Sequence, residues 1–589
     1  RGCAYPLSCR CSLAARRATR RGTPLRRPAC TCTQGTLAGP RTLRRAWELR
    51  VERSRHALSA ASEDVKTVVG NRPGAPAKTE SGDPPFTTLP GLIAHHAHVR
   101  PDVVALEEPG RRMTFGELDA SVARLASGLH RADLRAGDRL AYIGRNSVAY
   151  FELLFAAARL GAIMVPISWR ATSAEMDILV QDCRPRLIFA QDDLPATPRI
   201  IPANMRFIGT SGDTLAGWHC VEPAPEPAAL PRDAVLQIYT SGTTGTPKGV
   251  LLSHENLLRQ RQLDAAAGLP WADWNADDAT VVSMPVAHVS GTGWALYGLS
   301  YGARNLVVRD FDADTILDLV ADQGITKLFV VPAALQMLVD AFVRKPRTTR
   351  LTHILYGGAP ISQPLLQALL GAFSCDFVQL YGATECSGAA TALWPQDHLS
   401  GNRQLLASAG RAMPGVGIAV ADLTTGTVAP TGTGEVLIRG SGVMTGYWER
   451  EDESRRAIDR DGWLHTGDVG EIDQDGILTI RDRLKDMIIT GGENVYPAEV
   501  ENVLRLHPEI LEVAVVGLPD ERWGEAVTAY IVPRDAASFD QDAIRHWART
   551  MLAGYKCPKR VHLVEDLPRN ANGKILRRHL RPNVRSRSC

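Results

Sequence analysis

The chain has 589 residues, too many for one ordinary domain, and 44% of them are hydrophobic, which is typical of a globular protein with a sizeable core. No apolar run reaches membrane-spanning length, because the best candidate, residues 150–167, contains Glu152 and Arg159. The net charge is +3, but residues 1–60 contain 14 Arg and only two acidic residues, so the rest of the chain is acidic and offers no electrostatic footprint for nucleic acid.

The N-terminal segment, residues 1–84, has the composition of an extension and a linker. It is rich in Arg, Ala and Ser and poor in acids, as transit peptides are, and residues 70–85 are rich in Pro, Gly and Ser. A transit peptide and a translated upstream sequence are two possible interpretations of this segment. A disordered or spurious extension is the favoured interpretation. Five of the 11 cysteines lie here, and their two C-x-C pairs lack the His or Asp of a zinc site.

The other six cysteines are scattered without metal-type spacing. This pattern indicates reduced thiols in a cytoplasmic enzyme.

Regular elements alternate along the chain from about residue 114. Residues 114–130 predict a helix that begins with a capping box of Thr114 and Glu117. Strand-like residues 139–144, helical residues 149–161 and strand-like residues 162–167 follow, with Gly at the junctions. This order predicts a right-handed βαβ unit and a parallel sheet.

The pattern changes toward the C-terminus. The alternation continues through residues 326–373, short strands with turns dominate after about residue 430, and a smaller α+β pattern begins near residue 482. We therefore expect an α/β protein whose large N-terminal domain, residues 85–484, contains parallel-sheet αβ subdomains and a small β-barrel-like subdomain. A small mobile α+β domain, residues 485–589, would follow after a hinge near Lys485.

Residues 239–249, "YTSGTTGTPKG", follow the strand-like run "AVLQI". Gly allows a close approach of the backbone, and the hydroxyl groups add donors without bulk, so the loop suits phosphate oxygens. The nucleotide-binding pattern G-x-x-x-x-G-K-[ST] fails here, because the fifth residue after Gly242 is Pro247, and Gly249 follows Lys248. The sequence predicts a phosphate-binding loop of another kind.

Five further motifs accompany this loop: "YGATE" (381–385), "HTGD" (465–468), "RDRLKDMI" (481–488), "GGENVYPAEVE" (491–501) and "PRNANGKILRR" (568–578). In their order and spacing they resemble the adenylate-forming superfamily, which includes acyl-CoA synthetases, firefly luciferase and the adenylation domains of peptide synthetases. The resemblance spans residues 85–582. It implies that a carboxylate attacks the α-phosphorus of ATP and expels pyrophosphate, which gives an acyl-adenylate that a thiol then attacks.

The resemblance also implies the roles of individual residues in the first step. Thr240 and Glu385 would hold Mg²⁺, and Asp468 and Arg483 would contact the ribose. Tyr381 would stack near the adenine, and the backbone of residues 356–360, which include Gly358, would pass along the base and the acyl chain. Lys574 would extend toward the α-phosphate and the carboxylate and be the main catalytic residue of adenylation. The remaining expected nucleotide contacts are Ser241, Gly242, Thr243, Thr244, Gly245, Lys248 and Thr384.

For the second step, the resemblance implies that the C-terminal domain rotates about Lys485. This motion would bring Gly491, Gly492 and Trp523 beside the pantetheine arm of CoA, and His288 would act as a gate between the acyl pocket and the thiol tunnel.

One position departs from the pattern of some relatives. Cys557 stands where certain aryl-CoA ligases carry an Arg for the CoA nucleotide. The contact with the CoA nucleotide would then come from Lys556, from Lys559 or from another surface.

The favoured function is an acid–thiol ligase that makes acyl-CoA from a carboxylic acid, ATP and CoA. Residues 283–303 contain no Lys or Asp for the ammonium group of an amino acid, which favours a fatty or other apolar acid. The alternatives are a free-standing enzyme that loads a carrier protein, an aryl-acid–CoA ligase, a luciferase-like monooxygenase and a non-catalytic binding protein. Peripheral contact with a membrane and a homodimer stay open.

Overall fold

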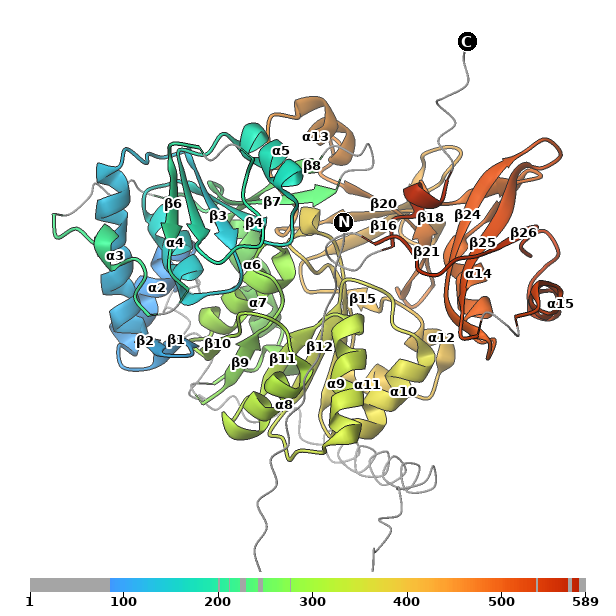
Figure 1. The fold of residues 1–589 in the computed structure, drawn as a ribbon, viewed down its shortest axis with the longest axis horizontal. Helices are drawn as coiled ribbons and strands as arrows, with labels where there is room; N and C mark the ends of the chain where they lie inside the picture. The colour runs from blue at the N-terminus through green and yellow to red at the C-terminus, as the bar shows by residue number, and fades with distance from the viewer. Residues whose placement is uncertain are drawn as a thin grey trace, which may run out of the picture. The chain divides into compact units, whose positions relative to one another are not determined.

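The computed structural model of the chain describes residues 85–199, 202–210, 212–222, 229–241, 247–275, 277–535, 539–569 and 575–581. The expected extension, residues 1–84, lies outside these residues. Strands of the described residues form four sheets, two of which are mainly parallel, and helices accompany them (Figure 1). The mixed α/β fold predicted from the alternation of elements is therefore confirmed.

The largest sheet has nine strands. Its spatial order is β15 (Arg411–Ala412), β14 (Thr391–Leu393), β13 (Asp376–Tyr381), β12 (His353–Gly357), β11 (Lys327–Val330), β9 (Ala279–Val282), β10 (Arg304–Val307), β1 (Val104–Glu108) and β2 (Arg111–Thr114). The strands from β13 to β1 are parallel, and antiparallel strands close both edges. Figure 1 shows helices α8 (Ala313–Asp322), α9 (Pro332–Arg344) and α10 (Gln363–Ala372) beside β11 and β12.

A second sheet has seven strands. Its order is β19 (Gly446–Tyr447), β8 (Pro247–Ser253), β7 (Ala234–Ser241), β4 (Ile163–Ser168), β3 (Arg139–Gly144), β5 (Leu187–Gln191) and β6 (Met205–Ile208). Strands β3 and β4 are parallel and are joined by α4 (Val148–Arg159), as the sequence predicts. The predicted capping box also forms at the start of α3 (Phe115–Arg131), where Thr114 and Glu117 each bond the other's backbone amide.

Residues 417–483 contribute an antiparallel sheet of five strands. Its order is β17 (Val428–Ala429), β16 (Gly417–Ala421), β18 (Gly432–Arg439), β20 (Leu464–Ile472) and β21 (Leu478–Arg483). The last sheet contains β23 (Glu493–Val495), β22 (Ile488–Thr490), β25 (Gly524–Pro533) and β24 (Ile510–Asp520), with β26 (Arg560–Leu563) parallel to β25. It is accompanied by α14 (Pro497–Leu504) and α15 (Gln541–Met551), which gives the small α+β pattern that the sequence predicts.

The remaining helices lie before, between and after these strands. They are α2 (Leu89–Val99), α5 (Ser173–Cys183), α6 (His254–Ala266), α7 (Val289–Ser300), α11 (Pro395–His398), α12 (Arg403–Leu406) and α13 (Glu451–Ala457), with 3₁₀ turns η1 (Ala216–Trp218), η2 (Pro270–Ala272), η3 (Thr384–Cys386) and η4 (Arg577–Leu580). Within the described ranges, no helix is both long and apolar enough to span a lipid bilayer. The domain boundary at residue 485 and the mobility of the C-terminal domain stay predictions.

Helix α4 shows why the most apolar stretch of the sequence tolerates charge. Eleven of its 12 residues are buried, as expected for a helix that is hydrophobic on every side. One of these buried residues, Glu152, is charged. Its carboxylate accepts two hydrogen bonds from Arg111, at 2.6 and 2.9 Å, and one from Ser121 at 2.6 Å. A buried carboxylate needs such partners, because an unpaired charge in the core is strongly destabilising.

The loop after β13 is closed by contacts that leave no room for a side chain at its first residue. A Cβ atom added at Gly382 would lie 2.7 Å from the carbonyl oxygen of Gly388 and 2.9 Å from the backbone of Ala389. We expect Gly382→Ala to destabilise the protein by about 1–3 kcal/mol through overpacking. The measurement is the thermal and denaturant midpoint of unfolding.

The matched control for this substitution is Gly217→Ala, because a Cβ atom there would meet nothing within 4 Å. Its midpoints should stay within about 0.5 kcal/mol of the wild-type values. Equal stability of the two variants would contradict the close packing of the loop.

Candidate active site

The glycine- and threonine-rich loop lies between two strands that pair with each other. Strands β7 and β8 pair antiparallel, with Ser241 opposite Pro247 and Thr240 opposite Lys248. A strand therefore follows the loop, whereas a helix follows the loop of the common nucleotide-binding motif, and the sequence-based distinction from that motif is confirmed. Gly242, Thr243, Thr244, Gly245 and the side chain of Ser241 lie outside the described residues, so their roles stay predictions.

The structure brings together the two residues expected to hold a metal ion. Glu385 lies in η3, four residues beyond the end of β13, and Thr384 begins the same turn. The Oε1 atom of Glu385 accepts a bond from the Thr240 hydroxyl at 3.4 Å and another from the Tyr447 hydroxyl at 3.1 Å. Carboxylate and hydroxyl oxygens are hard ligands of the kind that Mg²⁺ prefers, so the residues present fit this ion.

Lys248, the lysine at the end of the loop, forms an ion pair with Glu453 of α13. Its Nζ atom also lies 5.0 Å from the centroid of the Tyr447 ring, within the range of a cation–π contact. Tyr447 thus contacts both Lys248 and Glu385. The sequence alone does not point to Tyr447 and Glu453, because no motif or spacing relates residues 447–453 to a loop 200 residues earlier.

Asp468 lies between two of the other predicted site residues. The Tyr381 hydroxyl donates to its Oδ2 atom at 2.7 Å, and the Arg483 Nε atom lies 2.7 Å from its Oδ1 atom. Asp468 and Arg483 are direct partners in the β20–β21 ladder, so the sheet register places them together. Burial and then the charge of Asp468 raise the pKa of Tyr381 well above its ordinary value, so the phenol stays a donor.

The predicted gate and adenine contacts occupy defined backbone positions. His288 is the N-cap residue of α7, and its carbonyl accepts a bond from the amide of Gly291 at 3.0 Å. Gly358 is exposed just beyond the end of β12 and has a φ angle of +82°, a conformation that favours glycine. The roles of both residues stay predictions.

Helix α7 carries no charge, as its sequence shows, but α6 brings buried charge against it. The Arg261 Nη2 atom donates to the Gly293 carbonyl at 2.6 Å, and the Tyr297 hydroxyl donates to Asp264 at 3.2 Å. Burial raises the pKa of Asp264 to about 6. The sequence of residues 283–303 does not reveal this polar contact, because Arg261 and Asp264 belong to α6, which precedes that segment.

Lys574, the expected catalytic lysine, lies outside the described residues. The chain on either side of it comes together, since Arg569 and Ile575 form an antiparallel bridge and the Leu576 amide donates to the Pro568 carbonyl at 2.7 Å. The ends of the segment that carries Lys574 are therefore anchored to each other.

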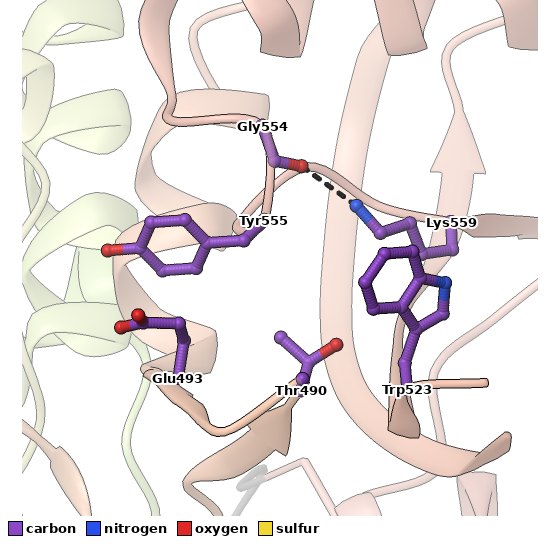
Figure 2. A pocket seen from close by; sticks show the side chains of 7 residues that line it. Thr490, Glu493, Trp523, Gly554, Tyr555 and Lys559 are labelled. Carbon is purple, nitrogen blue, oxygen red and sulfur yellow. Dashed lines mark hydrogen bonds between the residues drawn. The ribbon is translucent and has the colours of Figure 1, made fainter.

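A separate pocket of about 230 Å³ lies in the C-terminal sheet region (Figure 2). Its lining residues are Thr490, Gly491, Glu493, Trp523, Gly554, Tyr555 and Lys559. Figure 2 shows the rings of Tyr555 and Trp523 on opposite sides of the pocket. Gly491, which has a φ angle of +61°, donates its amide hydrogen to the Trp523 carbonyl at 2.7 Å, so these two residues are in contact, and their role beside the pantetheine arm stays a prediction. Gly492 follows with a φ angle of +85°.

Cys557 and the two lysines near this pocket differ in whether they could contact a ligand there. Cys557 is buried, and its thiol donates weak hydrogen bonds to the carbonyls of Leu552 and Ala553. Lys556 forms an ion pair with Glu499 at 2.6 Å. Lys559 lines the pocket and donates to the Gly554 carbonyl at 2.8 Å (Figure 2). Of the two lysines left open by the sequence, Lys559 is therefore the better placed for a ligand.

Comparison with known proteins supports the sequence resemblance. Residues 93–448 match the family described as AMP-binding enzyme, and residues 499–574 match the AMP-binding enzyme C-terminal domain. The chain is 39% identical to a fatty acid–[acyl-carrier-protein] ligase, ScoC, of Streptomyces coeruleorubidus over 85% of this chain and 96% of the relative. It is 36% identical to the long-chain-fatty-acid–CoA ligase FadD13 of Mycobacterium tuberculosis, over 83% and 97% of the two chains.

Among solved structures, the chain is similar to the O-succinylbenzoate coenzyme A synthetase of Bacillus subtilis in complex with ATP and a magnesium ion. The TM-score is 0.72 at 28% identity, and the match covers 83% of this chain and 98% of the other.

The Asp468 cluster generates a prediction about the ribose. Asp468→Asn keeps the shape of the side chain but removes its charge, so it would weaken a charge-assisted bond to a hydroxyl group by about 1.5–3 kcal/mol. We expect kcat/KM for ATP to fall about 10- to 100-fold, while kcat/KM for 2′,3′-dideoxy-ATP changes little. Steady-state kinetics with both nucleotides checks this.

The control for this substitution is Asp475→Asn, which changes an exposed carboxylate in the turn after β20. It should leave both nucleotides unaffected. An equal loss for ATP and the dideoxy analogue in Asp468→Asn would sink the ribose assignment.

Proposed function

Because the chain belongs to the family of AMP-binding enzymes and is an acid–thiol ligase, we propose that it activates an apolar carboxylic acid, of the fatty-acid kind, with ATP and then transfers the acyl group to CoA. The observation that carries this proposal is the meeting of two clusters at one loop. Tyr381, at the end of β13, contacts Asp468, and Glu385, four residues later, contacts Thr240 beside the phosphate loop. A nucleotide could thus extend from a ribose site to a phosphate site along this loop.

In the first step, a carboxylate oxygen of the acid attacks the α-phosphorus of ATP. The bond from that phosphorus to the oxygen of the β-phosphate breaks, and pyrophosphate leaves with both electrons of the bond. Negative charge builds up on the phosphate oxygens, so donors and cations that are already in place stabilise the transition state. Lys248 and the loop suit the β- and γ-phosphates, and Lys574 suits the α-phosphate.

Glu385 and Thr240 would hold Mg²⁺, which supplies charge neutralisation at the phosphates when it is bound. Asp468 is suited to accept the two ribose hydroxyls, because the Arg483 contact on Oδ1 and the Tyr381 contact on Oδ2 hold its carboxylate in one orientation. These residues therefore position the nucleotide and need no change of their own protonation.

In the second step, a thiol sulfur attacks the carbonyl carbon of the acyl-adenylate, AMP leaves, and the thiol proton is released. We place the acceptor in the pocket of Trp523, Tyr555 and Lys559, since two aromatic rings suit the adenine of CoA and a cation suits its phosphates. Rotation about Lys485 would bring this pocket to the reaction centre after pyrophosphate has left. Lys485 is exposed to solvent.

The acid class is proposed as apolar, because α7 carries no Lys, Arg, Asp or Glu that could pair with an ammonium group. The buried Arg261 and Asp264 contact α7 from its α6 side, and each has a partner there: the Gly293 carbonyl for Arg261 and the Tyr297 hydroxyl for Asp264. An aryl acid is the alternative of the same class. The cytoplasmic location and the oligomeric state stay predictions.

A carrier protein is the second candidate acceptor, and the similarity to a fatty acid–[acyl-carrier-protein] ligase at 39% identity supports it. The two acceptors share the thiol of a phosphopantetheine arm and differ in the nucleotide. The replacement of an Arg by the buried Cys557 removes one cation that could select CoA, whereas the aromatic pocket with Lys559 favours CoA.

The proposal is tested by pyrophosphate release with MgATP across a panel of fatty, aryl and amino acids, with CoA, with a phosphopantetheinylated carrier protein, or with neither. We expect sustained turnover with CoA and a preference for fatty acids. A single stoichiometric burst that CoA does not prolong, followed by turnover with the carrier protein, would favour the second candidate. No pyrophosphate with any acid would contradict both.

Lys574→Ala should separate the two steps. We expect acid-dependent pyrophosphate release to fall by about 10²–10³, the usual loss for one oriented transition-state donor, because the α-phosphate loses its cation. Thioester formation from supplied acyl-AMP should largely survive. Equal loss of both half-reactions would falsify the assignment of Lys574 to adenylation, and Lys345→Ala, at an exposed surface position, serves as the matched control.

A further inference from the structure

Tyr447 is the residue that joins the expected metal site to the expected phosphate site. Its hydroxyl donates to Oε1 of Glu385 at 3.1 Å, and the face of its ring lies 5.0 Å from Nζ of Lys248. The Glu385 side chain accepts hydrogen bonds from two hydroxyls, those of Thr240 and Tyr447. One side chain therefore contacts the carboxylate and the ammonium group on which the first step depends.

The backbone holds Tyr447 against the hairpin that carries the loop. Strand β19 contains two residues and pairs with β8, with Tyr447 opposite Val250. The next amide, of Trp448, donates to the carbonyl of Gly249 at 2.7 Å. The position of Tyr447 is thus set by the strand that begins directly after the loop.

Two residues that follow Tyr447 contact α5. The Trp448 ring donates to the Asp182 carbonyl at 3.2 Å, and Arg450 forms an ion pair with the Asp182 carboxylate at 2.6 Å. The Arg139 guanidinium lies 4.3 Å from the centroid of the Trp448 ring. These contacts leave Tyr447 little freedom to turn away from Glu385, and a rigid support is what a positioning residue requires.

We propose that Tyr447 is a positioning residue for MgATP: its hydroxyl orients the Glu385 carboxylate toward the metal, and its ring orients the Lys248 ammonium group toward the phosphates. The inference rests on the proposed function, since it assigns Glu385 and Lys248 the roles given there. The two contacts come from different parts of one side chain, so different substitutions separate them. Tyr447→Phe removes the hydroxyl and keeps the ring, whereas Tyr447→Leu removes both.

The test is the binding of ATP by isothermal titration calorimetry, with Mg²⁺ and with EDTA. We expect Tyr447→Phe to raise the Kd of MgATP about 2- to 10-fold, which corresponds to one ordinary hydrogen bond, and to leave the Kd of free ATP unchanged. Tyr447→Leu should weaken the binding of both forms, because Lys248 also loses its support. The ratio of the two Kd values is the readout that a merely structural role would not move.

Two further variants make the result specific. Tyr142→Phe removes a hydroxyl that donates to the Arg145 carbonyl at 2.7 Å in the core, and it should leave the metal-dependent ratio unchanged. In the Glu385→Gln background, Tyr447→Phe should have no further effect on that ratio, because the carboxylate through which the hydroxyl acts is gone. Circular dichroism and thermal melts of each variant establish that it is folded.

The outcomes distinguish this inference from the proposed function. If the wild-type protein binds MgATP more tightly than free ATP and Tyr447→Phe keeps that preference, the role of Tyr447 is wrong and the proposed function stands. An equal loss in Tyr142→Phe would also overturn the role of Tyr447. If the wild-type protein binds neither form of ATP, both the proposed function and this inference fail.

Discussion

The Glu385 carboxylate is the point on which the arrangement of the candidate site depends. It accepts bonds from Thr240, at the end of β7, and from Tyr447, in β19, while its own backbone belongs to the turn after β13. Two sheets therefore meet at one oxygen atom. A carboxylate held by two hydroxyls has a fixed orientation before any ligand arrives, and such preorganisation is the main source of electrostatic catalysis in phosphate chemistry.

Charged groups around the site are balanced by neighbouring side chains of opposite charge. Lys248 pairs with Glu453, and Arg483 pairs with Asp468. An ammonium group that already has a partner carries no uncompensated charge in the absence of substrate, and the negative phosphates can replace that partner on binding. This exchange keeps the folded protein free of isolated charges beside the loop.

The pocket of the C-terminal region has a different chemistry. It is bounded by the aromatic rings of Trp523 and Tyr555, with Lys559 as a lining cation, and the thiol of Cys557 is turned into the core. A binding surface of two rings with one lining cation suits a planar base and a phosphate beside it. The Glu385 and Asp468 clusters are built on β7, β13, β20 and β21, whereas this pocket belongs to the C-terminal sheet, so the two steps of the proposed reaction would use two different surfaces.

The sequence by itself determined the local features: the helix that begins at Thr114, the parallel βαβ unit, and a loop whose Pro247 excludes the common phosphate motif. These depend on periodicity, caps and backbone restrictions within a few residues, which a sequence displays directly. Its motifs also pointed to the Thr240–Glu385 and Asp468–Arg483 pairs, which the fold brings into contact. Only the tertiary structure decided that Tyr447 joins Glu385 to Lys248, because the pairing of β19 with β8 sets contacts between distant residues that no local pattern relates.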